Sequence, residues 1–167
     1  MNDRTYNVLI LCTGNSALSI LGEALVNLLG KGRFRGFSAG SHPTGKVNPG
    51  ALRLLQAQDI DTAELRSKSW DEFGLPGAPS MDFIFTVCDS AAGEACPVWP
   101  GHPVSAHFGV PDPAKLEGST EEIDQAFRQA WRTLRHRLQL FMQLPLDKLD
   151  AASLKSRLGE IGQSHPD

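Results

Sequence analysis

The chain alternates short apolar runs with segments whose apolar residues recur every three or four positions. The run VLIL at 8–11 is apolar at every position, which is typical of a strand buried on both faces. Segments 33–38 and 82–87, and more weakly 102–108, are predicted as further strands. Helical periodicity follows the first run, from about residue 16 to Gly30, where a glycine ends the pattern.

Three capping patterns predict where later helices begin. Asn48-Pro49 combines an N-cap residue with a proline at the first helical position. The stretches SWDE and STEE, beginning at Ser69 and Ser119, match capping boxes that open a short and a long helix. Pro145 ends the long helix, and a last helix is expected at about 149–161. The outer face of the long helix, interpreted as solvated, carries Arg128, Arg132, Arg135, His136 and Arg137.

Alternation of strands and helices predicts an α/β fold with a four-stranded parallel sheet and helices on both sides. The chain shows no internal repeat and no linker long enough to divide it. We therefore expect residues 1–167 to form one doubly wound domain, with its core at about 6–145 and a C-terminal helix at about 149–161.

Composition narrows the possible partners. The 167 residues carry a net charge of −3, so the chain lacks the excess of basic residues that is typical of nucleic-acid-binding proteins. A phosphate-like ligand would therefore be small and held locally. The start, MNDRTYNVLILC, has neither a basic leader nor a long apolar segment, and no stretch approaches about 18 uninterrupted apolar residues. We expect a soluble, cytoplasmic protein with no nucleic-acid or membrane partner.

The three cysteines, an odd number, fit poorly with a static disulfide framework. In a reducing cytosol such thiols are buried spacers, metal ligands or redox catalysts. A zinc site needs about four clustered ligands, which three scattered cysteines and stray histidines do not supply. No metal and no bound cofactor are predicted.

The stretch CTGNSALS begins at the end of the first strand and leads into the first helix. A small-residue turn at a helix N-terminus is suited to bind an anion, because amide N–H groups and the helix dipole both favour negative charge. Cys12 lies at the mouth of this turn, so the pKa of its thiol is expected to fall below the free value of roughly 8.5, which favours the thiolate. The predicted oxyanion loop comprises Thr13, Gly14, Asn15, Ser16, Ala17, Leu18 and Ser19.

Within this loop, Gly14 permits a backbone shape that other residues resist, and the side chains of Asn15, Ser16 and Ser19 can hydrogen-bond the loop's backbone. The alternative is a cysteine that merely finishes a strand beside an ordinary helix cap.

Four segments in order resemble the low-molecular-weight tyrosine phosphatase superfamily, in particular its arsenate reductase branch. They cover the chain from about residue 7 to 145 and are VLILCTGNSALS, FSAGSHPTGKVNPGAL (37–52), FTVCDSAAGEACPVWPG (85–101) and AHFGVPDP (106–113). The resemblance implies that Cys12 is the nucleophile and that Asn15 and Ser19 shape the loop. It also implies that Asp112 protonates the departing oxygen. The alternative for Asp112 is a plain Asp-Pro turn.

The resemblance also gives the other cysteines a role. Cys12 ends the first strand and Cys88 the third, so both should open onto one crevice of a parallel sheet. A relay follows in which Cys88 attacks Cys12 and releases arsenite, and Cys96 then attacks Cys88. The Cys88–Cys96 disulfide awaits a thioredoxin-type reductant.

Leu18 departs from the family pattern of Cys, five residues and Arg. That arginine grips oxyanion oxygens, and its loss costs on the order of 3 kcal/mol, or about a hundredfold in rate. We expect leucine to place apolar surface beside the anion. Some relatives bind a monovalent cation near the loop; Glu23 and Ser38 match parts of that site, and the Lys68 ammonium replaces the cation by hypothesis. The alternative is a solvated lysine.

The leading interpretation is a thioredoxin-coupled arsenate reductase weakened or inactivated by Leu18. The enzymatic alternative is a phosphatase acting on phosphotyrosine or a small phosphoester. Against it, Tyr6 is the one tyrosine, and the Asp112 loop has no aromatic pair to hold a phenyl ring. The non-enzymatic alternative is a degenerate domain that binds an oxyanion or a partner without turnover.

Overall fold

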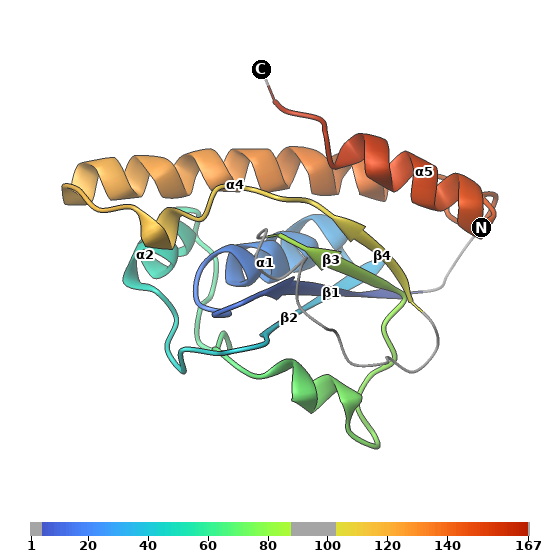
Figure 1. The fold of residues 1–167 in the computed structure, drawn as a ribbon, viewed down its shortest axis with the longest axis horizontal. Coiled ribbons are helices and arrows are strands. Elements are labelled where there is room, and N and C mark those ends of the chain that lie inside the picture. Colours follow the sequence, from blue (N-terminus) through green and yellow to red (C-terminus); the bar gives the residue numbers. More distant parts are fainter. Residues whose placement is uncertain (1–4, 88–102, 167) are drawn as a thin grey trace.

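A computed structural model describes residues 5–87 and 103–166, and Cys88 and Cys96 lie outside these ranges. The described residues contain a four-stranded sheet in the order β2-β1-β3-β4 with every neighbouring pair parallel, which confirms the predicted sheet (Figure 1). The strands are β1 (Tyr6–Cys12), β2 (Phe34–Gly40), β3 (Phe83–Thr86) and β4 (Val104–His107).

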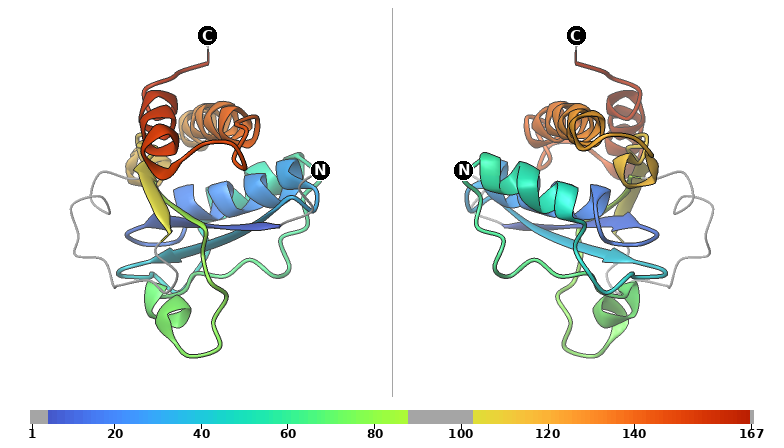
Figure 2. Two further views of the ribbon diagram at one scale, coloured as in Figure 1. Left: turned by 90° about the vertical axis from the view of Figure 1, so that its right-hand side faces the viewer. Right: turned by 90° about the vertical axis from the view of Figure 1, so that its left-hand side faces the viewer.

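Helices flank the sheet unequally. All four α-helices of the described residues lie on one side of it, and a 3-10 helix, η1, lies on the other (Figure 2). The prediction of flanking helices is therefore confirmed, although the second face is covered only by this short helix among the described helices. The helices are α1 (Leu18–Gly30), α2 (Pro49–Ala57), η1 (Trp70–Gly74), η2 (Pro113–Lys115), α4 (Thr120–Met142) and α5 (Ala151–Ile161).

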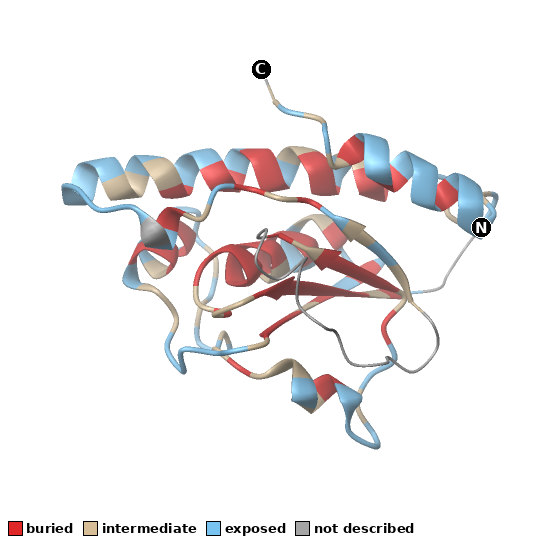
Figure 3. Ribbon diagram, in the orientation of Figure 1, coloured by how far each residue is buried: buried red, intermediate tan, exposed pale blue. Residues whose placement is uncertain are grey.

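The central strand β1 is buried on both faces, as its apolar run predicts (Figure 3). Val8 and Ile10 belong to the main core beneath the α-helices, whereas Leu9 and Leu11 belong to a smaller cluster on the opposite face with Phe73 of η1. The alternation follows from the period of two in a strand. None of the helices in the described residues is long and apolar enough to cross a bilayer.

Strand order places a topological switch at β1. The chain moves from β1 to β2 on one side and then returns to β3 on the other, so the connections diverge at the carboxyl end of β1. In open α/β sheets ligands bind in the crevice that such a divergence leaves. Cys12, the last residue of β1, lies at this point.

Helix starts were predicted with mixed success. Asn48 caps α2 by accepting from the Gly50 amide, and the capping box of Ser119 and Glu122 opens α4 as expected. The box predicted at Ser69 is wrong: Ser69 accepts from the Asp71 amide, and the Glu72 carboxylate instead pairs with Arg66 at 2.6 and 3.0 Å. A bidentate guanidinium offers that carboxylate stronger bonds than one backbone amide does.

The interpretation of Arg137 as a solvated residue is also wrong. Its side chain is 2% exposed, whereas Arg128, Arg132 and Arg135 on the same helix are exposed. The position faces a carbonyl-lined space between α4, the loop after β4 and the C-terminal tail, where a guanidinium finds hydrogen-bond acceptors. Helical periodicity alone does not reveal such a space.

A glycine in β2 permits the close packing of α1 on the sheet. A Cβ atom at Gly36 would lie 2.6 Å from the Glu23 carbonyl oxygen and 2.8 Å from Cβ of Val26. Gly36→Ala is expected to lower the free energy of unfolding by about 1–3 kcal/mol, because α1 must shift. Denaturant unfolding measures the change. As a control, Gly159→Ala in α5 meets no atom within 4 Å and should stabilise the protein by about 0.5–1 kcal/mol. Equal stability of the Gly36→Ala protein and the wild type would contradict this packing.

Candidate functional site

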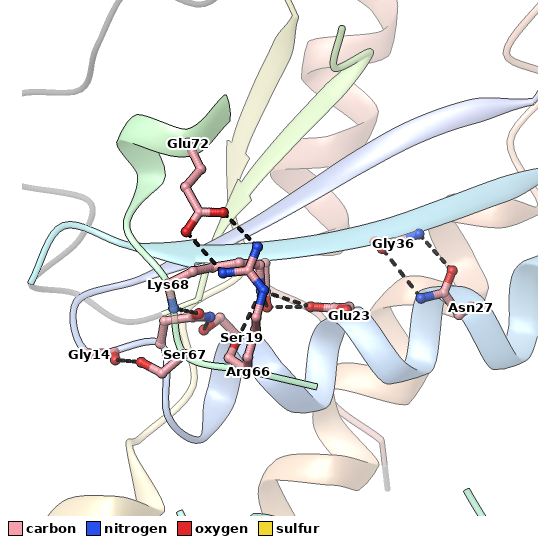
Figure 4. Close-up of polar contacts among 11 residues, drawn as sticks. Gly14, Ser19, Glu23, Asn27, Gly36, Arg66, Ser67, Lys68 and Glu72 are labelled. Atoms are coloured by element: carbon pink, nitrogen blue, oxygen red, sulfur yellow. Dashed lines mark hydrogen bonds and ion pairs between the residues drawn. The ribbon is translucent and has the colours of Figure 1, made fainter. Parts of the chain in front are cut away.

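The loop that follows β1 is held from one side by residues 41–48, here called the strap. The amides of His42, Thr44 and Asn48 donate to the carbonyl oxygens of Thr13, Gly14 and Ser16, at 2.9, 3.0 and 2.8 Å. The Ser67 hydroxyl also donates to the Gly14 carbonyl, at 3.1 Å (Figure 4). The loop's carbonyl groups therefore point outward.

This arrangement fixes where the loop's amides point. In a trans peptide the carbonyl of one residue and the amide of the next point in opposite directions, and the described residues contain no cis peptide. The N–H groups of Gly14, Asn15 and Ala17 consequently face away from the strap. Several amides turned to one side of a loop make an anion-binding concavity.

The backbone shape of the loop depends on Asn15 and Gly40 rather than on Gly14 as expected. Asn15 has a φ of 45°, a left-handed conformation that asparagine tolerates, whereas Gly14 is not left-handed. Gly40 at the end of β2 lies against the loop, since a Cβ there would clash with the Thr13 carbonyl and lie 3.0 Å from the Asn15 nitrogen. Sequence gave no signal for Gly40, because the contact arises only when β2 pairs with β1.

A buried polar network holds Asn15 in that conformation. Its Nδ2 donates to Ser19 Oγ at 2.7 Å, and its Oδ1 accepts from the Lys68 amide at 2.8 Å. Both Asn15 and Ser19 are fully buried. The two side chains therefore bond to each other, and Asn15 also to the Lys68 backbone, whereas bonds to the loop's own backbone were expected.

Helix α1 presents its positive end to the same place. Its N-cap residue, Ala17, makes no side-chain capping bond, and its first turn contains no acidic residue. The partial positive charge of the helix N-terminus is therefore not offset locally. Cys12, 6% exposed, lies at the opposite end of the loop, beside Gly40 in the sheet register.

Leu18 is fully buried in the main hydrophobic core, which also contains Cys12 and Ala17. The first residue of α1 faces the core, and an isobutyl group is stabilised by leaving water there. The expectation that Leu18 places apolar surface beside a bound anion stays a prediction.

Lys68 is buried, contrary to the alternative of a solvated lysine. Its ammonium lies 3.5 Å from Glu23 Oε1, 3.4 Å from Ser38 Oγ and 3.0 Å from the Arg66 carbonyl oxygen (Figure 4). Ser38 in turn donates to Glu23 at 2.5 Å. Burial is the main cause that lowers the pKa of Lys68, and Glu23 partly opposes it. The structure thus brings together the three residues of the cation-site hypothesis.

Asp112 lies in the loop that follows β4. It follows β4 by five residues and is half-buried, and its carboxylate accepts from the Ala114 amide at 2.9 Å, which caps η2. Parallel strands β1 and β4 end at the same edge of the sheet, so Cys12 and the loop of Asp112 share that edge (Figure 1). Within the described ranges no group of three His, Cys, Asp or Glu side chains is arranged to hold a metal ion.

Known proteins similar to this chain are arsenate reductases and phosphatases. A sequence model of the family described as "Low molecular weight phosphotyrosine protein phosphatase" matches residues 7–154. The arsenate reductase of Oceanobacillus iheyensis is 33% identical over 134 residues, 80% of this chain and 93% of that protein. The arsenate reductase of Bacillus subtilis (strain 168) is 31% identical over 136 residues, 81% of this chain and 94% of that protein.

Two solved structures share the fold. The arsenate reductase of Archaeoglobus fulgidus has a TM-score of 0.58 and 25% identity, covering 77% of this chain and 95% of that one. The low molecular weight protein tyrosine phosphatase of T. tengcongensis has a TM-score of 0.62 and 22% identity, covering 87% and 100%. The second likeness concerns the fold alone.

Replacing Lys68 tests its buried contacts. Lys68→Met should lower the free energy of unfolding by about 3 kcal/mol, because Glu23 is left without its cation. Lys155→Met on the exposed face of α5 should change it by less than about 0.5 kcal/mol. Denaturant unfolding measures both, and a Lys68→Met protein as stable as the wild type would contradict the interpretation.

The pH dependence of that difference follows from linkage. The pKa of Lys68 is lower in the folded chain than its ordinary 10.5, so the unfolded chain binds more protons between the two values. The stability of the wild type relative to Lys68→Met should rise with pH through this window. If the Lys68 ammonium replaces a bound monovalent cation, the denaturant midpoint of wild-type unfolding should be the same in potassium chloride and in sodium chloride of equal ionic strength.

Proposed function

We propose that this chain, which belongs to the low molecular weight phosphotyrosine protein phosphatase family, binds a tetrahedral oxyanion in the loop after β1 and reduces arsenate to arsenite there. The observation that carries the proposal is the orientation of the loop. Its carbonyls are bound by the strap, so the amides of Gly14, Asn15 and Ala17 face the other way, next to the uncapped start of α1. The arsenate reductases at 31–33% identity support arsenate as the substrate.

In the first step the thiolate of Cys12 attacks arsenic. An As–S bond forms while an As–O bond breaks, and the proton of Asp112 passes to the departing oxygen, which leaves as water. The loop amides and the helix N-terminus stabilise the negative charge on the remaining oxygens. To donate this proton, Asp112 must either release the Ala114 amide or keep that bond through one carboxylate oxygen while the other carries the proton.

In the second step the thiolate of Cys88 attacks the sulfur of Cys12. The S–S bond forms as the As–S bond breaks, and the bonding pair stays on arsenic, which is reduced from As(V) to As(III) and leaves as arsenite. Cys96 then attacks Cys88, frees the Cys12 thiolate and forms the Cys88–Cys96 disulfide. A thioredoxin-type dithiol supplies the two electrons that reopen it. These two roles rest on the sequence, since both cysteines lie outside the described residues.

Leu18 weakens this chemistry. A guanidinium at the end of the loop binds two oxygens and offsets charge that grows in the transition state, whereas backbone amides alone lack a full positive charge. The burial of Leu18 in the core is the observation that favours a second candidate, an oxyanion- or partner-binding domain without turnover. A phosphoester phosphatase needs Cys12 and Asp112 but neither Cys88 nor Cys96.

Restoring the arginine separates these functions. Leu18→Arg is expected to raise the rate of thioredoxin-coupled arsenate reduction by about a hundredfold or more, because a charge-assisted donor is regained. The same change should lower the free energy of unfolding by about 2–4 kcal/mol, because a buried leucine is lost from the core. Reduction is followed by thioredoxin oxidation, and stability by denaturant unfolding.

The matched control is Leu18→Met, which keeps an apolar side chain of similar volume and should leave both quantities nearly unchanged. A folded Leu18→Arg protein without reductase activity contradicts arsenate reduction, whereas activity equal to that of the wild type contradicts only the weakening by Leu18. If it instead hydrolyses phosphoesters, the phosphatase function holds, and if it binds phosphate without turnover, the binding domain holds.

The relay has its own test by peptide mass mapping. Arsenate without a reductant should produce the Cys88–Cys96 disulfide in the wild type and in Leu18→Arg, because each turnover ends in that bond. Cys12→Ser should abolish its arsenate-dependent formation. A wild-type chain that turns over arsenate without this disulfide would contradict the relay.

A further inference from the structure

Arg137 is a buried guanidinium that bonds to backbone carbonyls from two other parts of the chain. Its Nη1 donates to the Gly109 carbonyl oxygen at 2.7 Å, and its Nε donates to the Ser164 carbonyl oxygen at 3.0 Å. No carboxylate among the described residues pairs with it, and its burial lowers its pKa. Burying a cation without a counter-ion is costly, so the carbonyl bonds define what this side chain does.

One of these bonds holds the loop that carries Asp112. The backbone bonds of that loop to β3 and Val87 end early, with Phe108 donating to Thr86 at 2.7 Å and Val110 donating to Val87 at 2.9 Å. Beyond them the loop borders a cavity of about 360 Å³ lined by Asp112, Pro113, Thr133 and Arg137 among others. Packing against α4 is therefore incomplete there, and the bond from Arg137 to the Gly109 carbonyl ties the loop to α4.

The second bond holds the tail that follows α5. His136 Nε2 lies 2.7 Å from Ser164 Oγ, and a Cβ at Gly162 would lie 2.5 Å from the His107 carbonyl oxygen, so the tail lies directly on the end of β4. Helix α5 itself runs beside β4 (Figure 2). The family match ends at residue 154, inside α5, so these tail residues lie beyond it.

We propose that Arg137 is a positioning residue for Asp112, and that the tail at 162–164 completes its hold on the loop. The proposal rests on the role of Asp112 as proton donor given above. A planar guanidinium fixes two acceptors in one orientation, and a proton donor must be held within a fraction of an ångström of its acceptor to be efficient. Without Arg137 the loop loses its bond to α4 beside a cavity and shifts away from the crevice.

The first readout is the hydrogen exchange of single amides. Arg137→Met retains much of the aliphatic bulk and should speed exchange of the Val110 amide by about tenfold or more, while amides of β1 and β2 stay unchanged. The matched control is Arg135→Met, which replaces an exposed arginine of the same helix. It should change neither the exchange of the Val110 amide nor that of the β1 and β2 amides. A chain ending at residue 161 should resemble Arg137→Met.

The second readout separates positioning from mere support of the fold. In the Leu18→Arg background, hydrolysis of phenyl phosphate, a poor leaving group, is compared with that of 4-nitrophenyl phosphate, a good one. Asp112→Asn should lower kcat for phenyl phosphate by about a hundredfold and affect 4-nitrophenyl phosphate far less. Arg137→Met should change the same ratio in the same direction by about tenfold with KM unchanged, and Arg137→Lys, which retains one donor, should restore part of it.

Several outcomes overturn the proposal. If the exchange rate of the Val110 amide is unchanged in Arg137→Met, Arg137 does not hold the loop in place. Faster exchange with an unchanged leaving-group ratio, while Asp112→Asn alters that ratio, leaves Arg137 as a support of the fold only. No leaving-group effect of Asp112→Asn contradicts the role of Asp112 as proton donor in the proposed function, and the positioning role with it. The Asp112→Asn reference shows which of the two has failed.

Discussion

The site depends on the hydrogen bonds between the strap and the loop after β1. A peptide unit whose carbonyl oxygen accepts a hydrogen bond from one side must direct its amide to the other. The strap engages the carbonyls of Thr13, Gly14 and Ser16, and Gly40 lets β2 approach closely enough for this to happen. Cys12 and the start of α1 are then placed around a set of amides. The sheet serves this arrangement, because parallel pairing of β1 with β2 brings the loop and the strap together.

Electrostatic charge is distributed unusually around this loop. Leu18, the first residue of α1, is a core residue, so the loop offers amide dipoles and a helix N-terminus but no guanidinium of its own. A full positive charge lies instead behind the loop, on Lys68, whose backbone also fixes Asn15. Its ammonium is bound to Glu23 and Ser38, so it stabilises the network rather than contacting an incoming anion. Binding of an oxyanion therefore relies on the backbone.

The sequence predicted much of what is encoded locally, although the capping box at Ser69 is an exception. Continuous apolar runs located the strands, and Asn48 and Ser119 located helix starts. Cys12 was identified from its position between the first strand and a small-residue turn. Asn15 and Ser19 were identified from residue type, although they bond to each other rather than to the loop's backbone as expected. The resemblance to the family was confirmed by the match over residues 7–154.

What the sequence could not reveal depends on contacts between distant segments. Arg137 looks like any arginine on the outer face of a helix until the tail and the Gly109 carbonyl surround it. The glycine that the loop requires is Gly40, which lies in another strand, and the burial of Lys68 follows from its position between Ser38 and Glu23.

The central claim is that the loop binds a tetraoxyanion through its amides. Nuclear magnetic resonance of the amide groups during titration with phosphate, at ionic strength held constant with chloride, tests it directly. We predict saturable shifts of the Gly14, Asn15 and Ala17 amides, with Leu18 left in place. Saturable shifts that spare these amides, or shifts spread over exposed basic side chains only, would contradict the account.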